Sequence, residues 1–484
     1  MGLIGILLAL ALLIGLAYRS WSVLLLAPLA ALAAAAFAGE PLLAHWTQTF
    51  MGSAARFIAQ FFPIFLLGAL FGKLMDDSGS VQAIARYVGA KLGARRAILA
   101  VVIAGAMVTY GGVSLFVAFF VLVPMAQALF REANIPHRLM PAAIVLGTST
   151  FTMSALPGTP AIQNAIPMPF FGTTPFAAPG LGIIASAIMV AFGLWWLGLR
   201  EAAARRNGDG YGVEPATVPA EAADNLTVRE RATTAREFDP AEILHGKRSD
   251  TPPTIFIAVL PLVVVVAVNL LMSMVVLPRI DLAFLGEDRW GPTSLAAVGG
   301  VWSVVVALTA AIIVLIALNR GRLDDLRSSM DAGVNASVLP VVSVASLVGF
   351  GAVIAALPAF ATVRDWVLSI EGGPLVSLAV STNVLAALTG SASGGLTIAL
   401  DALGETYMRL AQDLGIDPAL MHRVAVIGAG TLDSLPHNGA VVTLLAVCGS
   451  THGKSYFDIV MAGILGPIVA LVAVILLGTL FGSF

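Results

Sequence analysis

The chain has 484 residues, of which 58% are apolar and only 11% are charged, and its formal net charge is −2. Soluble domains carry about 25% charged residues, so this composition excludes an ordinary soluble protein and predicts a polytopic membrane protein. The single cysteine, Cys448, excludes an internal disulfide framework and a cysteine-based metal cluster. The sequence contains no G-x-x-x-x-G-K-[ST] loop, which argues against ATP-driven pumping.

The first half of the chain, residues 1–199, contains several apolar runs that suit transmembrane helices of ~20 residues. The uncharged run 97–130 is too long for one span and too short for two spans with a turn, and it carries TYGGVS (residues 109–114, the first tip) at its middle. A helical hairpin that enters and leaves on one side fits this run, since non-helical backbone at membrane depth is tolerated only inside protein or beside water. We predict spans near 2–18, 21–38, 54–73 and 178–199, the hairpin 97–130, and a proline-broken span over 139–170.

The second half, residues 254–484, follows the same plan. Residues 200–253 before it are rich in alanine and charged residues and are predicted to be a disordered cytoplasmic linker. The run 372–400 carries TGSASGG (residues 389–395, the second tip) and is predicted to be a second re-entrant hairpin. We predict spans near 254–277, 293–318, 333–358 and 456–482, and a proline-broken span over 419–447.

Matched spacings indicate an internal repeat. Gly112 precedes Pro157 by 45 residues, Ser391 precedes Pro436 by 45 residues, and Gly112 and Ser391 are 279 residues apart. Each half has five crossings, an odd number, so the second half should be inverted relative to the first. We therefore predict an all-α polytopic membrane protein of two inverted repeats, the architecture of many secondary transporters.

The distribution of basic residues predicts the orientation in the membrane. With the N-terminus and the C-terminus outside, 20 of the 26 lysines and arginines lie at the cytoplasmic side, as the positive-inside rule expects. The remaining six are Arg56, Arg279, Arg289, Arg364, Arg409 and Arg423. We expect a multi-pass protein of the inner (plasma) membrane.

Helices that stop inside the membrane direct unpaired N–H groups and a partial positive charge toward the centre of the protein. The sequence places no lysine or arginine at depth in the hairpins or broken spans, so we predict that these helix ends and hydroxyl groups bind a single carboxylate. Glycine and proline can also merely kink or pack membrane helices. The predicted substrate-binding residues are Thr109, Tyr110, Gly111, Gly112, Ser114, Pro157, Gly158, Thr159, Gln163, Asn164, Gly390, Ser391, Ser393, Gly394, Ser434 and Asn438.

Asp433 and His437 are the predicted proton-coupling residues. Ionisable groups inside a membrane usually face a cavity and have a function. His437 would titrate near neutral pH, and burial would raise the pKa of Asp433. The alternative is a structural Asp–His pair. Other acids, including Asp76, Asp77, Asp401 and Glu405, are expected to be solvated charges at the ends of spans.

Five segments carry a resemblance to a known family. LFGKLMDDSG, the hairpin RRAILAVVIAGAMVTYGGVSLFVAFFVLVPMAQALF, LPGTPAIQNAIP, GSASGGLTIAL and LDSLPHNGA resemble the gluconate permease (GntP) family of the ion transporter superfamily. The resemblance implies proton symport of gluconate or a related small acid, such as 3-hydroxybutyrate or D-serine. The superfamily implies a homodimer and an elevator mechanism. The first tip lacks the acid of the gluconate carriers, and LPGTP replaces their PPHPGP, which favours a short hydroxy acid.

Other functions remain open from the sequence. A sodium-coupled carrier of the same fold could use Ser381, Thr382 and Asn383 as oxygen ligands. A channel would use the hairpins as a selectivity filter, and a membrane enzyme would use Asp433 and His437 as a catalytic pair. We expect a transporter rather than an enzyme, with no cofactor, no metal site and no nucleic-acid partner.

Overall fold

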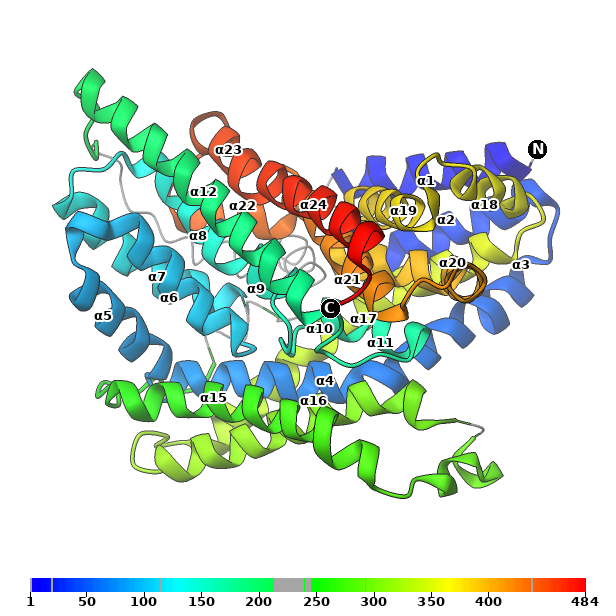
Figure 1. The fold of residues 1–484 in the computed structure, drawn as a ribbon, viewed down its shortest axis with the longest axis horizontal. Helices are drawn as coiled ribbons and strands as arrows, with labels where there is room; N and C mark the ends of the chain where they lie inside the picture. The colour runs from blue at the N-terminus through cyan, green and yellow to red at the C-terminus, as the bar shows by residue number, and fades with distance from the viewer. Residues whose placement is uncertain are drawn as a thin grey trace.

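The computed structural model describes residues 2–18, 21–113, 115–212, 239, 245–291, 293–436 and 438–484. These residues form helices joined by turns, and no strand occurs among them (Figure 1). Six helical segments are long and apolar enough to cross a membrane: Leu42–Asp77, Pro179–Asn207, Ile255–Arg279, Leu295–Leu318, Leu326–Ala356 and His452–Phe481. The described part of the chain is therefore all-helical, with the long apolar helices of a multi-pass membrane protein.

The first half begins with two apolar helices and a long third one. The helices α1 (Gly2–Tyr18) and α2 (Val23–Ala38) pack against each other, and α4 (Met51–Asp77) continues directly from a π-helical turn, His45–Phe50. The short helix α5 (Ser80–Leu92) and the following helical segment, Ala94–Tyr110, meet at an angle of 99°. The remaining helices are α3 (Leu42–Ala44), α5 (Ser80–Leu92), α6 (Ala97–Tyr110), α7 (Leu115–Glu132), α8 (Met140–Thr148), α9 (Phe151–Ser154), α10 (Ile162–Ala165), α11 (Pro167–Phe171) and α12 (Pro179–Asn207).

The second half contains α15 (Ile255–Leu271), α16 (Leu295–Leu318), α17 (Leu326–Ala356), α18 (Phe360–Leu368), α19 (Gly373–Thr389), α20 (Ala392–Leu414), α21 (Pro418–Thr431), α22 (Gly439–Val447), α23 (His452–Val460) and α24 (Gly466–Phe481). The helix α20 runs 14 residues past 400, where we expected the hairpin to end. Its charged Asp401 and Glu405 are exposed, while Leu403 and Tyr407 between and after them are buried. These charges therefore mark one face of an amphipathic helix and not its end.

Two helix–turn–helix pairs and two interrupted helices surround the centre of the molecule. The helices α6 and α7 pack against each other across the first tip, and α19 and α20 do so across the second tip. The chain is interrupted between α9 and α10 (residues 155–161, the first break) and between α21 and α22 (residues 432–438, the second break). The long helices α4 and α17 pack along each other beside these elements, with α15 and α16 on their far side in the view of Figure 1.

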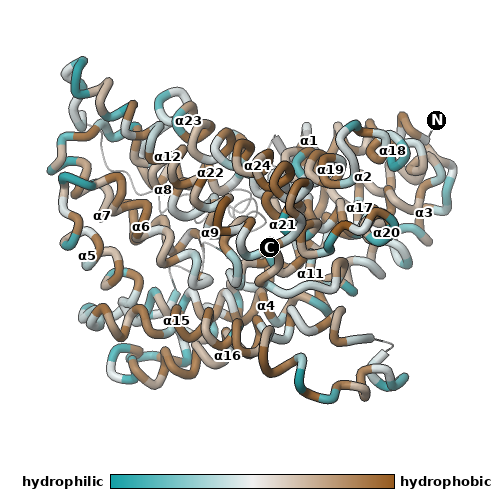
Figure 2. The backbone as a smooth tube through the Cα atoms, in the orientation of Figure 1, coloured by the Kyte–Doolittle hydropathy of each residue, from teal (hydrophilic) through white to brown (hydrophobic). Residues whose placement is uncertain are grey.

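Hydropathy follows this arrangement. Figure 2 shows apolar residues along most helices and hydrophilic residues gathered in the connecting turns and at helix ends. Most of the buried apolar residues form one continuous core, and a smaller second core joins α1 and α2 to Phe50, Phe350 and Ile398. Both halves of the chain therefore contribute to a shared interior.

The end of α4 carries a buried ion pair. Lys73 Nζ lies 3.1 Å from Asp77 Oδ1, and both side chains are at most 2% exposed. Asp76 Oδ2 lies 2.7 Å from a guanidinium nitrogen of Arg248, and the amide of Ser249 donates a 2.8 Å hydrogen bond to the carbonyl of Asp77. The expectation that Asp76 and Asp77 are solvated is wrong, because residues 245–250 fold back over this helix end. Most of the expected linker, residues 213–238 and 240–244, lies outside the described residues.

Candidate functional site

The second tip presents a helix N-terminus with buried hydroxyl groups. Gly390 ends α19 in the left-handed conformation (φ +65°), which glycine adopts without strain. Ser391 then caps α20, because its Oγ accepts a 3.1 Å hydrogen bond from the amide of Gly394. The hydroxyls of Ser391 and Ser393 lie 3.2 Å apart, and neither residue is exposed. The predicted tip residues thus form one compact turn.

Asp433 joins the second tip to the second break. Its Oδ1 accepts hydrogen bonds from the amide of Ala392 (3.0 Å) and from Nδ2 of Asn438 (2.9 Å). Asn438 Nδ2 also donates to the carbonyl of Gly390 (2.9 Å), and Asn438 Oδ1 accepts from the amide of Ala440 and so caps α22. The carboxylate therefore lies at the N-terminus of α20, where the helix dipole stabilises negative charge. His437 lies outside the described residues, so its pairing with Asp433 stays a prediction.

The first tip is joined to the first break in a similar manner. The hydroxyl of Tyr110 donates a 2.7 Å hydrogen bond to the carbonyl of Pro157. Thr109 Oγ1 donates to the carbonyl of Gly105 (2.9 Å) and lies 3.2 Å from Thr152 Oγ1. Ser114 lies outside the described residues.

Two predicted glycines of the first tip are in tight places. Gly112 has φ +96°, and a Cβ atom there would lie 2.8 Å from Cγ of Pro160. Gly111 packs directly on Leu262 of α15. A side chain at either position would force the first tip away from its neighbours.

The first break has its own hydrogen bonds. Gly158 has φ +81°, its amide donates to the carbonyl of Pro175 (2.8 Å), and its carbonyl accepts from Nδ2 of Asn269 on α15 (3.1 Å). Thr159 is buried, and its carbonyl accepts from Nδ2 of Asn164 (3.1 Å). Asn269 was not among the predicted residues, because its partner is a backbone carbonyl from the other half of the chain.

The two tips and the two breaks lie in one region. The helices α9 and α21 cross so closely that a Cβ atom on Gly430 would lie 2.9 Å from Cβ of Ser154. The helix α10 contacts α20 and α21, and α22 contacts α7. Elements of the first half therefore pack against elements of the second half, as a single shared site requires.

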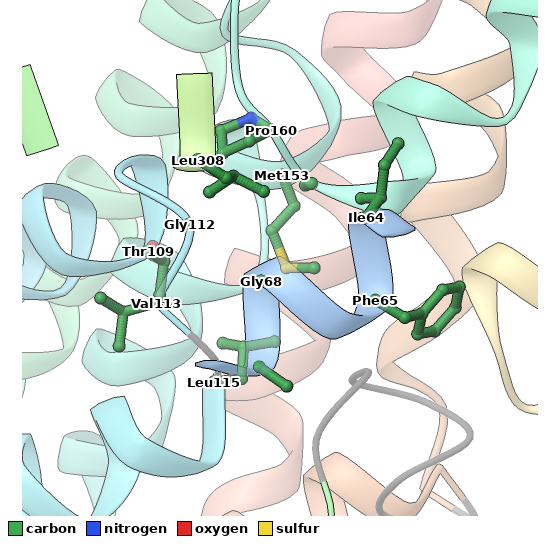
Figure 3. A pocket seen from close by; sticks show the side chains of 12 residues that line it. Ile64, Phe65, Gly68, Thr109, Gly112, Val113, Leu115, Met153, Pro160 and Leu308 are labelled. Atoms are coloured by element: carbon green, nitrogen blue, oxygen red, sulfur yellow. The ribbon is translucent and has the colours of Figure 1, made fainter. Parts of the chain in front are cut away.

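A small cavity lies where the first tip and the first break meet α4. Its volume is about 50 Å³. Figure 3 shows Thr109 and Gly112 of the first tip, Met153 and Pro160 near the first break, and Ile64 and Gly68 of α4 among the residues around it. Small-molecule pockets usually occupy roughly 300–1,000 Å³, so this cavity has room for a few water molecules and not for an organic acid.

Two of the predicted residues have buried polar atoms without partners. Gln163 is 2% exposed, and neither the nitrogen nor the oxygen of its amide has a hydrogen-bond partner. The hydroxyl of Ser434 is likewise buried and unpaired. Buried polar groups are usually hydrogen-bonded, so groups like these are candidates for binding a ligand. Asn164 differs from Gln163, because its amide is occupied by protein partners.

Those partners include two residues that the sequence reasoning missed, His422 and Arg423 of α21. The Nε2 atom of His422 lies 3.1 Å from Asn164 Oδ1, and the guanidinium of Arg423 donates to the carbonyl of Ala177 (2.6 Å). Arg423 is fully buried, so the second broken span carries an arginine in the protein interior, which the sequence analysis did not expect. The sequence does contain a signal for this residue, because Arg423 is a single arginine within an otherwise uncharged helical run. The sequence analysis assigned that arginine to the outer side of the membrane.

The three residues considered as sodium ligands form hydrogen bonds with other groups of the protein. The hydroxyls of Ser381 and Thr382 donate to the carbonyl of Leu378, at 3.0 and 2.8 Å, and Asn383 Oδ1 accepts a hydrogen bond from Thr431. Among the described residues, no three His, Cys, Asp or Glu side chains are grouped to hold a metal ion.

For the transport function that the sequence predicts, removing the hydroxyl groups of the second tip is expected to weaken uptake of the substrate. The S391A variant loses the cap of α20, worth about 1 kcal/mol, and S393A loses the neighbouring hydroxyl. Both variants should be expressed normally, since the loss is small and local. Initial uptake rates at equal amounts of purified protein measure the effect, and normal uptake by both variants would remove the second tip from the site.

Comparisons with known proteins identify transporters. A model of GntP family permeases matches residues 1–170. The uncharacterized transporter YxjC of Bacillus subtilis (strain 168) is 42% identical over 466 residues, which cover 95% of each chain. A high-affinity gluconate transporter of Escherichia coli (strain K12) is 37% identical over 106 residues, 21% of this chain and 23% of that protein.

Two solved structures share the fold. The YdaH transporter of Alcanivorax borkumensis has a TM-score of 0.55 and 16% identity, covering 91% of this chain and 89% of that one. MtrF of Neisseria gonorrhoeae, described with a class of antimetabolite efflux pumps, has a TM-score of 0.54 and 14% identity, covering 90% and 84%. At these identities the likeness concerns the fold alone.

Proposed function

Because this chain belongs to the GntP permease family, and is therefore a membrane transporter and not an enzyme, we propose that it is a secondary symporter. Its substrate is a small organic monocarboxylate, a short hydroxy acid such as 3-hydroxybutyrate or else gluconate, and its coupling ion is the proton. The observation that carries the proposal is Asp433, a buried carboxylate whose Oδ1 bonds both the second tip and the second break. Such a group inside a transporter is well placed to couple protonation to movement.

The proposed architecture is a pair of inverted repeats. Adding 279 to the bounds of α6 gives 376–389, close to α19 (Gly373–Thr389), and adding it to α7 gives 394–411, within α20 (Ala392–Leu414). The same shift takes α4 to 330–356, within α17 (Leu326–Ala356). This match supports the repeat. We further propose a homodimer in the inner membrane, with both termini outside and residues 200–253 in the cytoplasm.

The proposed mechanism is an elevator-type movement of the tips and breaks. The cavity between the first tip and α4 measures about 50 Å³, so a substrate that binds there needs the first tip to separate from α4. Gln163 and Ser434 would bind the substrate, because their buried polar atoms have no protein partner. The predicted residues of both tips and both breaks would complete the site.

The proposed coupling residues are Asp433 and His437. When Asp433 is ionised, its Oδ1 holds the amide of Ala392 and the amide group of Asn438. Protonation removes the charge and weakens both hydrogen bonds, since bonds to charged groups are roughly twice as strong as neutral ones. The second tip is then released from the second break.

Uptake into proteoliposomes tests the proposal. Labelled gluconate and 3-hydroxybutyrate are supplied outside, under an imposed inward proton gradient, with and without sodium. We expect one of the two acids to accumulate above its external concentration under the proton gradient alone. Accumulation that needs a sodium gradient at fixed pH would replace the proton by sodium, and accumulation of neither acid would refute the proposed substrate class.

A further inference from the structure

Arg423 is a buried cation whose bonds go to neutral groups. Its side chain has no exposure, its Nε and one terminal nitrogen donate to the carbonyl of Ala177 at 3.1 and 2.6 Å, and its other terminal nitrogen reaches the carbonyl of Ser154 at 3.4 Å. No carboxylate of the described residues lies within the 4.0 Å of an ion pair with it. An arginine stays protonated in proteins, so among the described residues this positive charge has no counterion.

His422, the titratable residue next to Arg423 in α21, does not compensate that charge. Asn164 Nδ2 donates to the carbonyls of Thr159 and Pro175, which identifies Oδ1 as the acceptor facing α21. His422 Nε2 lies 3.1 Å from this oxygen and therefore carries a proton, and the Thr173 hydroxyl, which can donate, lies 2.6 Å from His422 Nδ1. The imidazole is satisfied in its neutral form, and a carboxylate is absent from the set. The local charge is that of the guanidinium.

The charge lies beside the first break. A terminal nitrogen of Arg423 is 3.5 Å from Asn164 Oδ1, and the next residue toward the break is Gln163, whose buried amide has no partner. A buried charge without a counterion costs free energy, and an anionic ligand that binds beside it lowers that cost. A charge without a counterion beside Asn164 and an unpaired amide on the preceding residue, Gln163, therefore point to a ligand that supplies both an anion and a hydrogen-bonding group.

We infer that Arg423 sets the charge selectivity of the substrate site: its positive field assigns the first break to the carboxylate of the substrate, which Gln163 contacts directly. Arg423 holds Asn164 in position and supplies the positive electric field, but it does not touch the substrate. It is therefore a positioning residue. This inference rests on the proposed transport of an organic acid and assigns the carboxylate end to the first break. Asp433 and the second break then face the remainder of the substrate.

Transport kinetics give the first test. In wild-type proteoliposomes, 3-hydroxybutyramide, the neutral analogue, should compete poorly with labelled 3-hydroxybutyrate. We expect R423Q to raise KM for the acid at least about tenfold, because the positive field that favours the carboxylate is lost, with a smaller change in kcat. The variant should also lose the preference for the acid over the amide. R423K keeps the charge and should keep that preference. R409Q removes an exposed arginine of α20 and should match the wild type.

A stability cycle tests the same inference without transport. The positive charge of Arg423 should stabilise the carboxylate that Q163E introduces, so Q163E should have a higher Tm than Q163L. In the R423Q background the order should reverse, because a buried carboxylate then has no cation. An unchanged order, or an acid preference in R423Q equal to that of the wild type, would overturn the inference. Failure of the wild type to accumulate either acid would instead refute the proposed function and leave the stability cycle to decide the role of Arg423.

Discussion

Replacing Lys73 with methionine is expected to lower the free energy of unfolding by about 3–5 kcal/mol, because it leaves a buried carboxylate without its cation. Lys73 Nζ is the ion-pair partner of Asp77 Oδ1 at 3.1 Å, and both side chains are at most 2% exposed. The other oxygen of Asp77, Oδ2, is buried without a hydrogen-bond partner. Denaturant unfolding of the purified protein in detergent measures the change.

Two matched variants show whether burial is the cause. The double variant K73M/D77L replaces the pair by apolar side chains and should recover most of the loss, since removing both charges removes the desolvation penalty as well. R138Q breaks the exposed pair between Arg138 and Asp209, and it should change stability by less than about 1 kcal/mol. A loss in K73M no larger than that in R138Q would contradict the buried ion pair.

Replacing Asp433 with asparagine is expected to lower proton-driven uptake roughly 10-fold to 100-fold. Asparagine keeps the shape of the side chain and an oxygen that can accept a hydrogen bond from the amide of Ala392. It loses the negative charge that strengthens both hydrogen bonds of Asp433. This loss is worth about 1.5–3 kcal/mol. It also cannot take up a proton. Initial uptake rates under the proton gradient measure the effect.

The control for this variant is D401N, which removes an exposed carboxylate from α20 and should transport as the wild type does. If Asp433 carries the proton, D433N should still exchange internal for external acid at equal concentrations while failing to accumulate it. Full accumulation by D433N would transfer the proton-coupling role to His437.

The positions of the interruptions follow from local chemistry and could be predicted from the sequence. Gly390 and Gly112 adopt positive φ angles, and Ser391 and Asn438 cap the helices that follow. These preferences belong to the residues themselves. The tips and breaks therefore appear in the structure close to the segments in which the sequence placed them.

The partners of the charged residues could not be predicted in the same way. Arg423 was counted among the six basic residues outside, yet its bonds go to Ala177 and Ser154 of the other half. Asp76 was placed in solvent, although Arg248, far along the chain, covers it. Such burial depends on which distant segments meet, and an apolar run contains no local signal for that.

The most direct test of coupled transport is the internal pH of proteoliposomes that contain a trapped pH-sensitive dye. Addition of 3-hydroxybutyrate or gluconate outside, with no ion gradient imposed, should acidify the interior of wild-type vesicles as protons enter with the acid, and D433N vesicles should show no acidification beyond that of protein-free vesicles. Labelled acid that enters wild-type vesicles with no change of internal pH would contradict proton symport.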